Sequence, residues 1–263
     1  DIGDFIGVKG FVFRTQTGEI SVHAQELTLL SKSLKPLPIV KYKDGVAYDK
    51  FDDPELRYRQ RYVDLVVNDG VKDTFLKRAT VLRTLRKVLD EAGYTEVETP
   101  TLQSIAGGAS ARPFITHFNA LDQDMYMRIA TELYLKRLIV GGFEGVYEIG
   151  KNFRNEGMDR NHNPEFTCME LYVQYKDYNW MMAFTEKLLE TICIAVNGSP
   201  EREIDGKMVS FKAPYRRLPI LDAIKEKTGF DCNGKTEEEI RAFCLEKGME
   251  VDETFGKGKL IDE

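Results

Sequence analysis

Cysteine, histidine and tryptophan are scarce in this chain of 263 residues, which contains four, three and one of them, respectively. The cysteines are widely spaced and form no Cys-X-X-Cys pair, which argues against a zinc site and for a reduced compartment. No apolar run reaches the length of a membrane span, and the first residues lack the basic start and apolar stretch of a signal peptide. We therefore expect a cytoplasmic protein with no membrane partner.

An excess of basic residues is also missing, since the net charge is −6. Composition alone thus gives no argument for nucleic-acid binding, although a local basic surface remains compatible with it. Hydrophobic residues make up 42% of the chain and charged residues 30%, as in ordinary globular proteins. The length is sufficient for one large domain or two smaller ones.

The first half of the chain changes pattern near residue 53. Residues 4–30 alternate apolar and polar side chains around the turn signal Thr17-Gly18, which predicts a β-hairpin. Residues 31–55 hold three prolines and many charges, which indicates a linker. Helical spacing then predicts one helix over 54–67 and a second one that ends at Gly93.

The second half mixes strands and helices without the regular alternation of a parallel sheet. Strands are predicted at TEVETPTL, DMYMRIA, GVYEIGKNFRNE and PEFTCMELYVQY, with a Gly-rich loop at GGASARPF and a helix from Thr131 to Ile139. A long helix capped by Asp177, a hairpin at EIDGKMV and three shorter helices follow. These patterns predict an α+β fold with an antiparallel sheet flanked by helices.

The stretch FRNEGMDRNHNPEFTCMELY stands out when its side chains are assigned to the two faces of the predicted strands. Side chains alternate between the two faces of a strand, so Phe166, Cys168, Glu170 and Tyr172 share one face. Thr167, Met169, Leu171 and Val173 share the other face, which we expect to lie in the core. On the preceding strand Asn152, Arg154 and Glu156 fall on a common face, which pairing of the two strands would align with Phe166 and Glu170.

Two interpretations of this polar face are open from the pattern alone. One is a solvated sheet face with cross-strand ion pairs. The other is a platform for a nucleotide and a small charged substrate. Arginine binds phosphate or carboxylate with two parallel hydrogen bonds, phenylalanine stacks on a base, and carboxylates hold an amine.

The sequence of this stretch also resembles that of a known protein family. FRNEGMDRNHNPEF resembles the second signature motif of class II aminoacyl-tRNA synthetases, and the run from GGASARPF to FRNEG is similar to the bacterial lysyl-tRNA synthetase family. EVETPTL and the helix before it resemble the first motif, which builds the dimer interface. GDFIGVKGFVFRTQTGEISVHAQEL resembles the last strands of the anticodon-binding OB-fold. The resemblance implies an OB-fold part over 1–38, a linker over 39–55 and a partial catalytic domain over 56–263.

The resemblance also implies an activity and its residues. The family joins L-lysine to ATP as lysyl-adenylate and transfers the lysyl group to tRNA(Lys), as a homodimer. Arg154 would be the catalytic residue that bridges the lysine carboxylate and the α-phosphate. The residues that it implies for ATP are Arg154, Glu156, His162, Asn163 and Phe166. Those that it implies for lysine are Gly108, Glu132, Arg154, Glu170 and Tyr172.

Two parts of the family pattern have no counterpart here. Two strands of the OB-fold are present, whereas closure requires five. No stretch after Gly198 resembles the third motif, with its second ATP-binding arginine, or the acidic Mg²⁺ ligands. We therefore expect no metal ligand in this chain, and no or very weak activity from these residues alone.

Four alternatives to this function remain. The chain could be a non-catalytic piece that binds RNA or dimerises, and the cluster Arg57, Arg59 and Arg61 suits either contact or a solvated helix face. A synthetase for aspartate or asparagine belongs to the same subgroup, but Glu132, Glu170 and Tyr172 suit an ammonium group. A protein-lysylating paralogue would lack the OB-fold strands.

Overall fold

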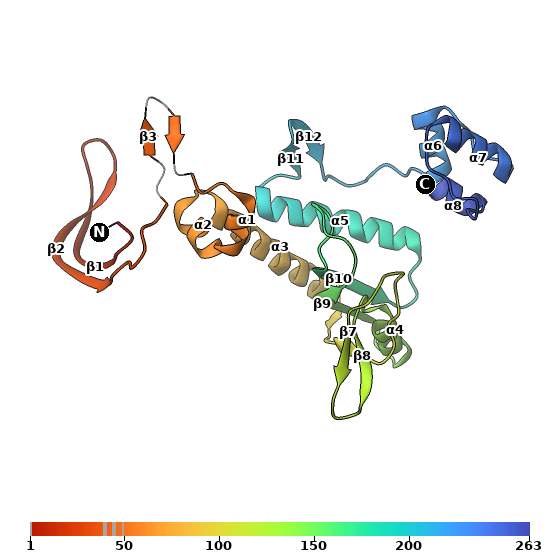
Figure 1. Ribbon diagram of the computed structural model, residues 1–263, viewed down its shortest axis with the longest axis horizontal. Coiled ribbons are helices and arrows are strands. Elements are labelled where there is room, and N and C mark those ends of the chain that lie inside the picture. The colour runs from red at the N-terminus through yellow and green to blue at the C-terminus, as the bar shows by residue number, and fades with distance from the viewer. Residues whose placement is uncertain (1, 39–40, 44–45, 49) are drawn as a thin grey trace. The chain divides into compact units, whose positions relative to one another are not determined.

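Runs of strands and runs of helices follow one another in the computed structural model, which describes residues 2–38, 41–43, 46–48 and 50–263 (Figure 1). Two compact units divide the chain, Asp1–Ala92 and Gly93–Glu263. The first holds β1 (Phe5–Arg14), β2 (Ile20–Ser31), β3 (Lys41–Lys43), β4 (Val46–Tyr48), α1 (Pro54–Arg59), α2 (Arg61–Val67) and α3 (Val71–Glu91). The second holds β5 (Thr95–Glu96), β6 (Leu102–Gln103), β7 (Ile115–Phe118), β8 (Gln123–Met127), α4 (Glu132–Val140), β9 (Gly145–Phe153), β10 (Glu165–Val173), α5 (Tyr178–Asn197), β11 (Glu201–Ile204), β12 (Lys207–Ser210), α6 (Ile220–Thr228), α7 (Glu237–Glu246) and α8 (Lys257–Asp262).

The predicted N-terminal hairpin is confirmed. β1 and β2 pair antiparallel around a turn in which Gly18 adopts a φ of +89°. The register shifts between Lys9 and Gly10, where a side chain on Gly10 would come within 2.0 Å of the His23 carbonyl oxygen. The short pair β3–β4 lies within the stretch 39–55 that the sequence indicates as a linker.

The prediction of a single helix over 54–67 is wrong, because this segment forms two helices. Gln60, with φ −118° and ψ 52°, separates α1 from α2, because the side-chain periodicity runs through a break that only the backbone reveals. Arg57 and Arg61 both form ion pairs with the buried carboxylate of Asp64, and Arg59 pairs with Glu55. The arginine cluster is therefore matched by acids of its own unit.

Two small sheets organise the second unit. β9 pairs antiparallel with β10, and β6, β8 and β7 form an antiparallel group in that order, while α4 packs on β9 and β10 (Figure 1). These features confirm the expected antiparallel sheet flanked by helices. The strand predicted at TEVETPTL shrinks to the two residues of β5, which join β9 in parallel.

The fully buried residues of this sheet lie on β9 rather than on β10. Val146 and Tyr147 are fully buried, as is Leu135 of α4. The expectation that Thr167, Met169, Leu171 and Val173 belong to the core is wrong in degree, because all four are only partly buried. Alternation identifies which residues share a face, but it does not reveal how completely that face is covered.

A buried ion pair links the residue after β8, β9 and the segment after β5. Arg128, 4% exposed, donates from Nη1 to Glu148 Oε1 at 2.5 Å, and Glu148 is 3% exposed. The Thr99 hydroxyl donates to Glu148 Oε2 at 2.6 Å, and Arg128 Nε donates to the Lys151 carbonyl oxygen at 2.8 Å. A side chain at Gly150 would come within 2.2 Å of the Arg128 guanidinium, so glycine leaves room for the pair.

Arg128→Met is expected to lower the free energy of unfolding by about 3–5 kcal/mol, because it leaves Glu148 buried without its partner. Lys151→Met is the control, since it breaks the exposed Lys151–Glu165 pair and is expected to cost under about 1 kcal/mol. Urea unfolding measures both. Equal losses for the two variants would contradict a structural role for the buried pair.

The remaining helices follow their sequence signals. The Asp177 side chain accepts from the Trp180 backbone N–H at 2.8 Å and caps α5, as predicted. α6, α7 and α8 share a core of Cys232, Ile240, Cys244 and Leu260. Within the part of the chain that the structure describes, no helix combines the length and the apolar character needed to cross a membrane.

Candidate active site

The nucleotide-side candidates lie where β9 and β10 leave their shared ladder. Phe166 stands opposite Asn152 in the antiparallel register. The Arg154 backbone N–H donates to the Pro164 carbonyl oxygen at 2.9 Å, one step beyond the last ladder pair. Since side chains alternate along a strand, Asn152, Arg154 and Phe166 share a face. This is the pairing that strand parity predicted from the sequence.

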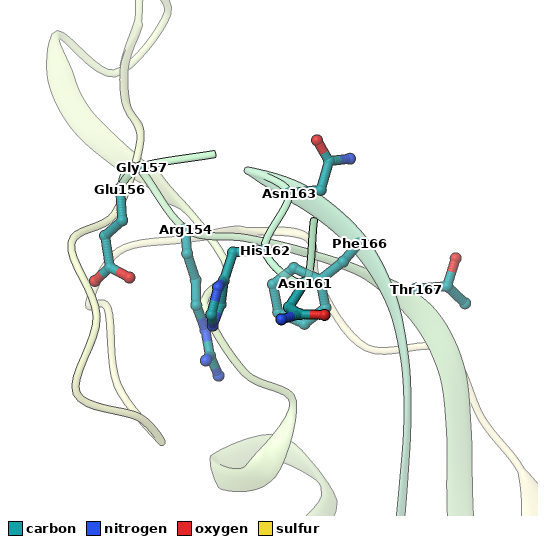
Figure 2. Close-up of a pocket in the computed structure, with 8 residues that line it drawn as sticks. All are labelled: Arg154, Glu156, Gly157, Asn161, His162, Asn163, Phe166 and Thr167. Carbon is teal, nitrogen blue, oxygen red and sulfur yellow. The ribbon is translucent and has the colours of Figure 1, made fainter. Parts of the chain in front are cut away.

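A pocket of about 360 Å³ opens at this end of the two strands. Figure 2 shows Arg154 and His162 directed to the same side as the Phe166 ring. The structure brings together all five residues that the resemblance assigns to ATP. The lining consists of Arg154, Glu156, Gly157, Asn161, His162, Asn163, Phe166 and Thr167.

The Arg154 guanidinium lies over the Phe166 ring and has a buried N–H group without a hydrogen-bond partner among the described residues. Its guanidinium carbon lies 5.2 Å from the centroid of Phe166. Its Nε is buried and has no hydrogen-bond partner among the described residues. A guanidinium that rests on a ring keeps its N–H groups in a fixed plane, where they suit the two oxygens of a phosphate or carboxylate.

Asp159 organises the loop between the two strands. It accepts from the backbone N–H groups of Asn161 and His162, each at 2.7 Å, and from His162 Nδ1 at 2.8 Å. The hydrogen bond from the His162 side chain, followed by those from the two backbone groups, lowers the pKa of Asp159. The carboxylate therefore stays ionised at neutral pH and holds the His162 ring at the pocket wall.

The Gly-rich loop over 107–114 is tied to the same pocket through its backbone. Glu156 Oε1 accepts from the Arg112 N–H at 3.2 Å, and the Asn155 N–H donates to the Arg112 carbonyl oxygen at 2.7 Å. Asn163 behaves differently, since its side chain donates to the Glu165 carbonyl oxygen at 2.6 Å and points away from the ring in Figure 2. Its side chain is thus engaged outside the pocket.

The four lysine-side candidates other than Arg154 also gather in one place. Tyr172 donates to Glu170 Oε2 at 3.2 Å, and Glu170 Oε1 accepts from the Thr131 N–H at 3.3 Å. Burial, and then the charges of Glu170 and Glu132, raise the pKa of Tyr172. Two carboxylates near one partly buried phenol create a negative potential, which suits a cation and disfavours an acidic ligand.

Gly108 and Lys136 complete this cluster. Gly108 has a φ of +88°, and a side chain there would lie 3.1 Å from the β-carbon of Glu132. Lys136 Nζ lies 2.5 Å from Glu132 Oε1 and 6.0 Å from the Tyr172 ring centroid. An ammonium group of the chain itself thus already occupies the surroundings of Glu132.

Gly108→Ala is expected to displace Glu132 and to weaken lysine binding, besides lowering stability by about 1–2 kcal/mol through backbone strain. Gly142→Ala is the matched control: Gly142 also has a positive φ, +106°, but a side chain there would meet nothing within 4 Å. Thermal unfolding and lysine titration of both variants separate strain from crowding. If both bind lysine equally well, Gly108 is needed only for its backbone.

Cys168 stands between the two groups of residues. Burial and the charge of Glu170 raise the pKa of its thiol, while the charges of Arg154 and Arg128 lower it. Arg154 of the nucleotide side and Glu170 of the acidic side therefore both influence the pKa of the Cys168 thiol. The face of β10 from Phe166 to Tyr172 is thus a continuous platform with a cationic end and an acidic end.

Sequence reasoning missed part of this arrangement. Gly157 and Asn161 line the pocket without having been singled out, and Thr167, expected in the core, lines it as well. The ion pair of Arg128 with Glu148 was also missed, and the register places Glu148 directly opposite Glu170. A charged residue inside the apolar run DMYMRIA was the available signal for that pair. Among the described residues, no group of three or more His, Cys, Asp or Glu side chains could hold a metal ion.

Comparison with known proteins agrees with this geometry. The family described as tRNA synthetases class II (D, K and N) matches residues 53–252. All 263 residues align at 66% identity with a lysine–tRNA ligase of Porphyromonas gingivalis (strain ATCC BAA-308 / W83), over 46% of that protein. They align at 63% identity with a lysine–tRNA ligase of Azobacteroides pseudotrichonymphae genomovar. CFP2, over 53% of it.

A lysine–tRNA ligase of Christiangramia forsetii is 60% identical, again over the whole chain and 46% of the relative. The chain spans about half the length of the curated relatives that it matches. The family match covers the loop over 107–114, α4, β9, β10 and the connection 154–164 between these two strands, which together carry every candidate site residue. The chain therefore belongs to the class II tRNA synthetases of the D, K and N group.

Proposed function

We propose that this protein activates L-lysine with ATP to form lysyl-adenylate, and that it transfers the lysyl group to tRNA(Lys). The observation that carries the proposal is the single face of β9 and β10 with a guanidinium over Phe166 at one end and two carboxylates at the other. The names of the relatives support lysine as the amino acid.

The first step joins two anions, and Arg154 is the residue that makes this possible. An oxygen of the lysine carboxylate attacks the α-phosphorus of ATP, the bond from that phosphorus to the bridging oxygen breaks, and pyrophosphate leaves. The carboxylate is already ionised, so no general base is required. Positioning and charge stabilisation carry the step, and one guanidinium with parallel N–H groups serves both reactants.

Each remaining pocket residue receives a role that its chemistry supports. The adenine ring lies against Phe166, its amino group meets Glu156, and His162 contacts the outer phosphates. On the acidic side, the Gly108 backbone and Glu170 hold the α-amino group, while Glu132 and Tyr172 face the ε-ammonium. Carboxylates left unpaired by a neutral or acidic amino acid would penalise its binding strongly.

The same proposal implies a compartment, an oligomeric state and a metal ion for the reaction. The protein works in the cytoplasm as a homodimer, with the contact around residues 75–100. Mg²⁺ accompanies ATP by neutralising phosphate charge.

Amino-acid-dependent exchange between ATP and pyrophosphate tests the proposal. The sample is the longest natural form of the protein that contains these 263 residues, and the amino acids compared are lysine, aspartate and asparagine. We expect exchange with lysine and a preference of at least about 10²-fold over aspartate, because the pocket leaves two acids to be matched. A preference for aspartate or asparagine would overturn the assignment to lysine.

A further inference from the structure

Asn152 is a buried amide that the proposed chemistry does not use. It is 1% exposed, and neither its Oδ1 nor its Nδ2 has a hydrogen-bond partner among the described residues. The only other such side-chain atoms in that part of the chain are Arg154 Nε and the Tyr94 hydroxyl. Buried polar atoms are nearly always paired in native proteins, so this pair of neighbours calls for an explanation.

The register places these atoms around one ring. Asn152 lies directly opposite Phe166, and Arg154 follows two residues later on the same face. The Arg154 guanidinium rests on that ring at 5.2 Å. Three atoms without partners among the described residues, two from Asn152 and one from Arg154, therefore lie on the same sheet face as Phe166, which lines the pocket.

The neighbouring charges already have partners. Glu148 accepts from both Arg128 and Thr99, and Arg128 donates to the Lys151 carbonyl oxygen as well. None of these groups hydrogen-bonds to the Asn152 amide or to Arg154 Nε among the described residues. Their chemistry is complementary, because Nε of arginine only donates and an amide both donates and accepts.

We propose that Asn152 is a positioning residue that fixes the plane of Arg154. One buried water accepts from Arg154 Nε and donates to Asn152 Oδ1, a site with enough polar partners to hold a water molecule. With Nε tethered, the two terminal nitrogens of the guanidinium face the phosphate and the carboxylate. Only this last consequence rests on the proposed function, since the tether itself is a property of the chain.

The test compares two substitutions that each remove buried polar atoms lacking a partner. Asn152→Leu removes the proposed tether, whereas Tyr94→Phe removes the unpaired hydroxyl of a residue that packs on Phe184, at 5.7 Å between ring centroids. Tyr94→Phe is expected to keep or raise Tm, because an unpaired buried hydroxyl is lost, whereas Asn152→Leu is expected to lower Tm, because it leaves Arg154 Nε buried without its partner. Asn152→Ala serves in place of the leucine variant if that one does not fold.

Hydrogen exchange of the Arg154 Nε–H, followed by NMR and assigned by its disappearance in Arg154→Lys, reads the tether without any ligand. We expect exchange about tenfold faster in Asn152→Leu or Asn152→Ala than in the parent, the factor for one lost hydrogen bond. It stays slow in Asn152→Asp, which keeps an acceptor, and in Tyr94→Phe. Unchanged exchange in the leucine or alanine variant overturns the proposal.

ATP binding measured by calorimetry gives the second arm. Asn152→Leu is expected to weaken ATP binding in the parent and to have no further effect in Arg154→Ala, because it acts through that arginine. An equal fold-loss in both backgrounds would show an independent structural effect and contradict the tether. Absence of ATP binding by the parent protein would instead contradict the proposed function, and the exchange rates would still decide on Asn152.

Discussion

Arg154→Ala is expected to reduce kcat/KM for lysine-dependent adenylate formation by at least about 10³-fold, the range seen when a group that stabilises transition-state charge is removed. The guanidinium rests on Phe166 in a pocket that opens beside it, with its Nε buried. No other arginine or lysine side chain lines this pocket in the described part of the chain. The loss should fall mainly on kcat, because charge on the phosphoryl oxygens develops during the reaction.

Two further substitutions make this result specific. Arg154→Lys keeps the charge but not the parallel N–H groups, so it should recover only a small part of the activity. Arg160→Ala is the matched control, since Arg160 is an exposed arginine of the same loop that does not line the pocket. Activity of Arg154→Ala within about tenfold of the parent would contradict a role in the transition state.

Glu132→Gln is expected to weaken lysine binding by roughly 30-fold or more and to leave ATP binding unchanged, because it removes one partner of a charge pair. Glu132 and Glu170 both act on Tyr172, so they define the acidic end of the platform. The effect should stay moderate, since Lys136 already neutralises part of the Glu132 charge in the free protein. Calorimetric titration with lysine and with ATP measures binding at the acidic end and at the cationic end of the platform separately.

The control for this prediction comes from β10, the strand that carries Glu170 and Tyr172. Glu165→Gln removes an exposed carboxylate of β10 that pairs with Lys151 on the surface, and it should change neither titration. If Glu132→Gln weakened ATP and lysine binding alike, the substitution would have disturbed the whole platform, and Glu132 would lose its assigned role.

Much of the site's framework was predictable because it depends on local signals. The alternation in GVYEIGKNF and EFTCMELYV predicted β9 and β10, and the same parity placed Arg154 on the face of Phe166. Gly93 predicted the end of α3 and adopts a positive φ of 84°, and Asp177 predicted the start of α5 and caps it. Such signals lie within a few residues of the element that they define.

The features that were missed depend on contacts between distant segments or on the backbone itself. Nothing local in the Gly-rich loop indicates that the Arg112 backbone meets Asn155 and Glu156. The burial of Asn152 likewise follows from the elements packed around β9, and the break at Gln60 follows from its backbone angles. The assignment of ligands to side chains came from the family resemblance, because residue pattern alone left a solvated polar face open as well.

A crystal structure with a non-hydrolysable lysyl-adenylate analogue tests the central claim most directly. The account predicts adenine on Phe166, the phosphate substitute against Arg154, and the lysine ammonium between Glu132 and Tyr172, with Lys136 displaced from its present position. An analogue bound away from β9 and β10, or one whose ammonium group lies outside the acidic end, would contradict the claim that this one face holds both reactants.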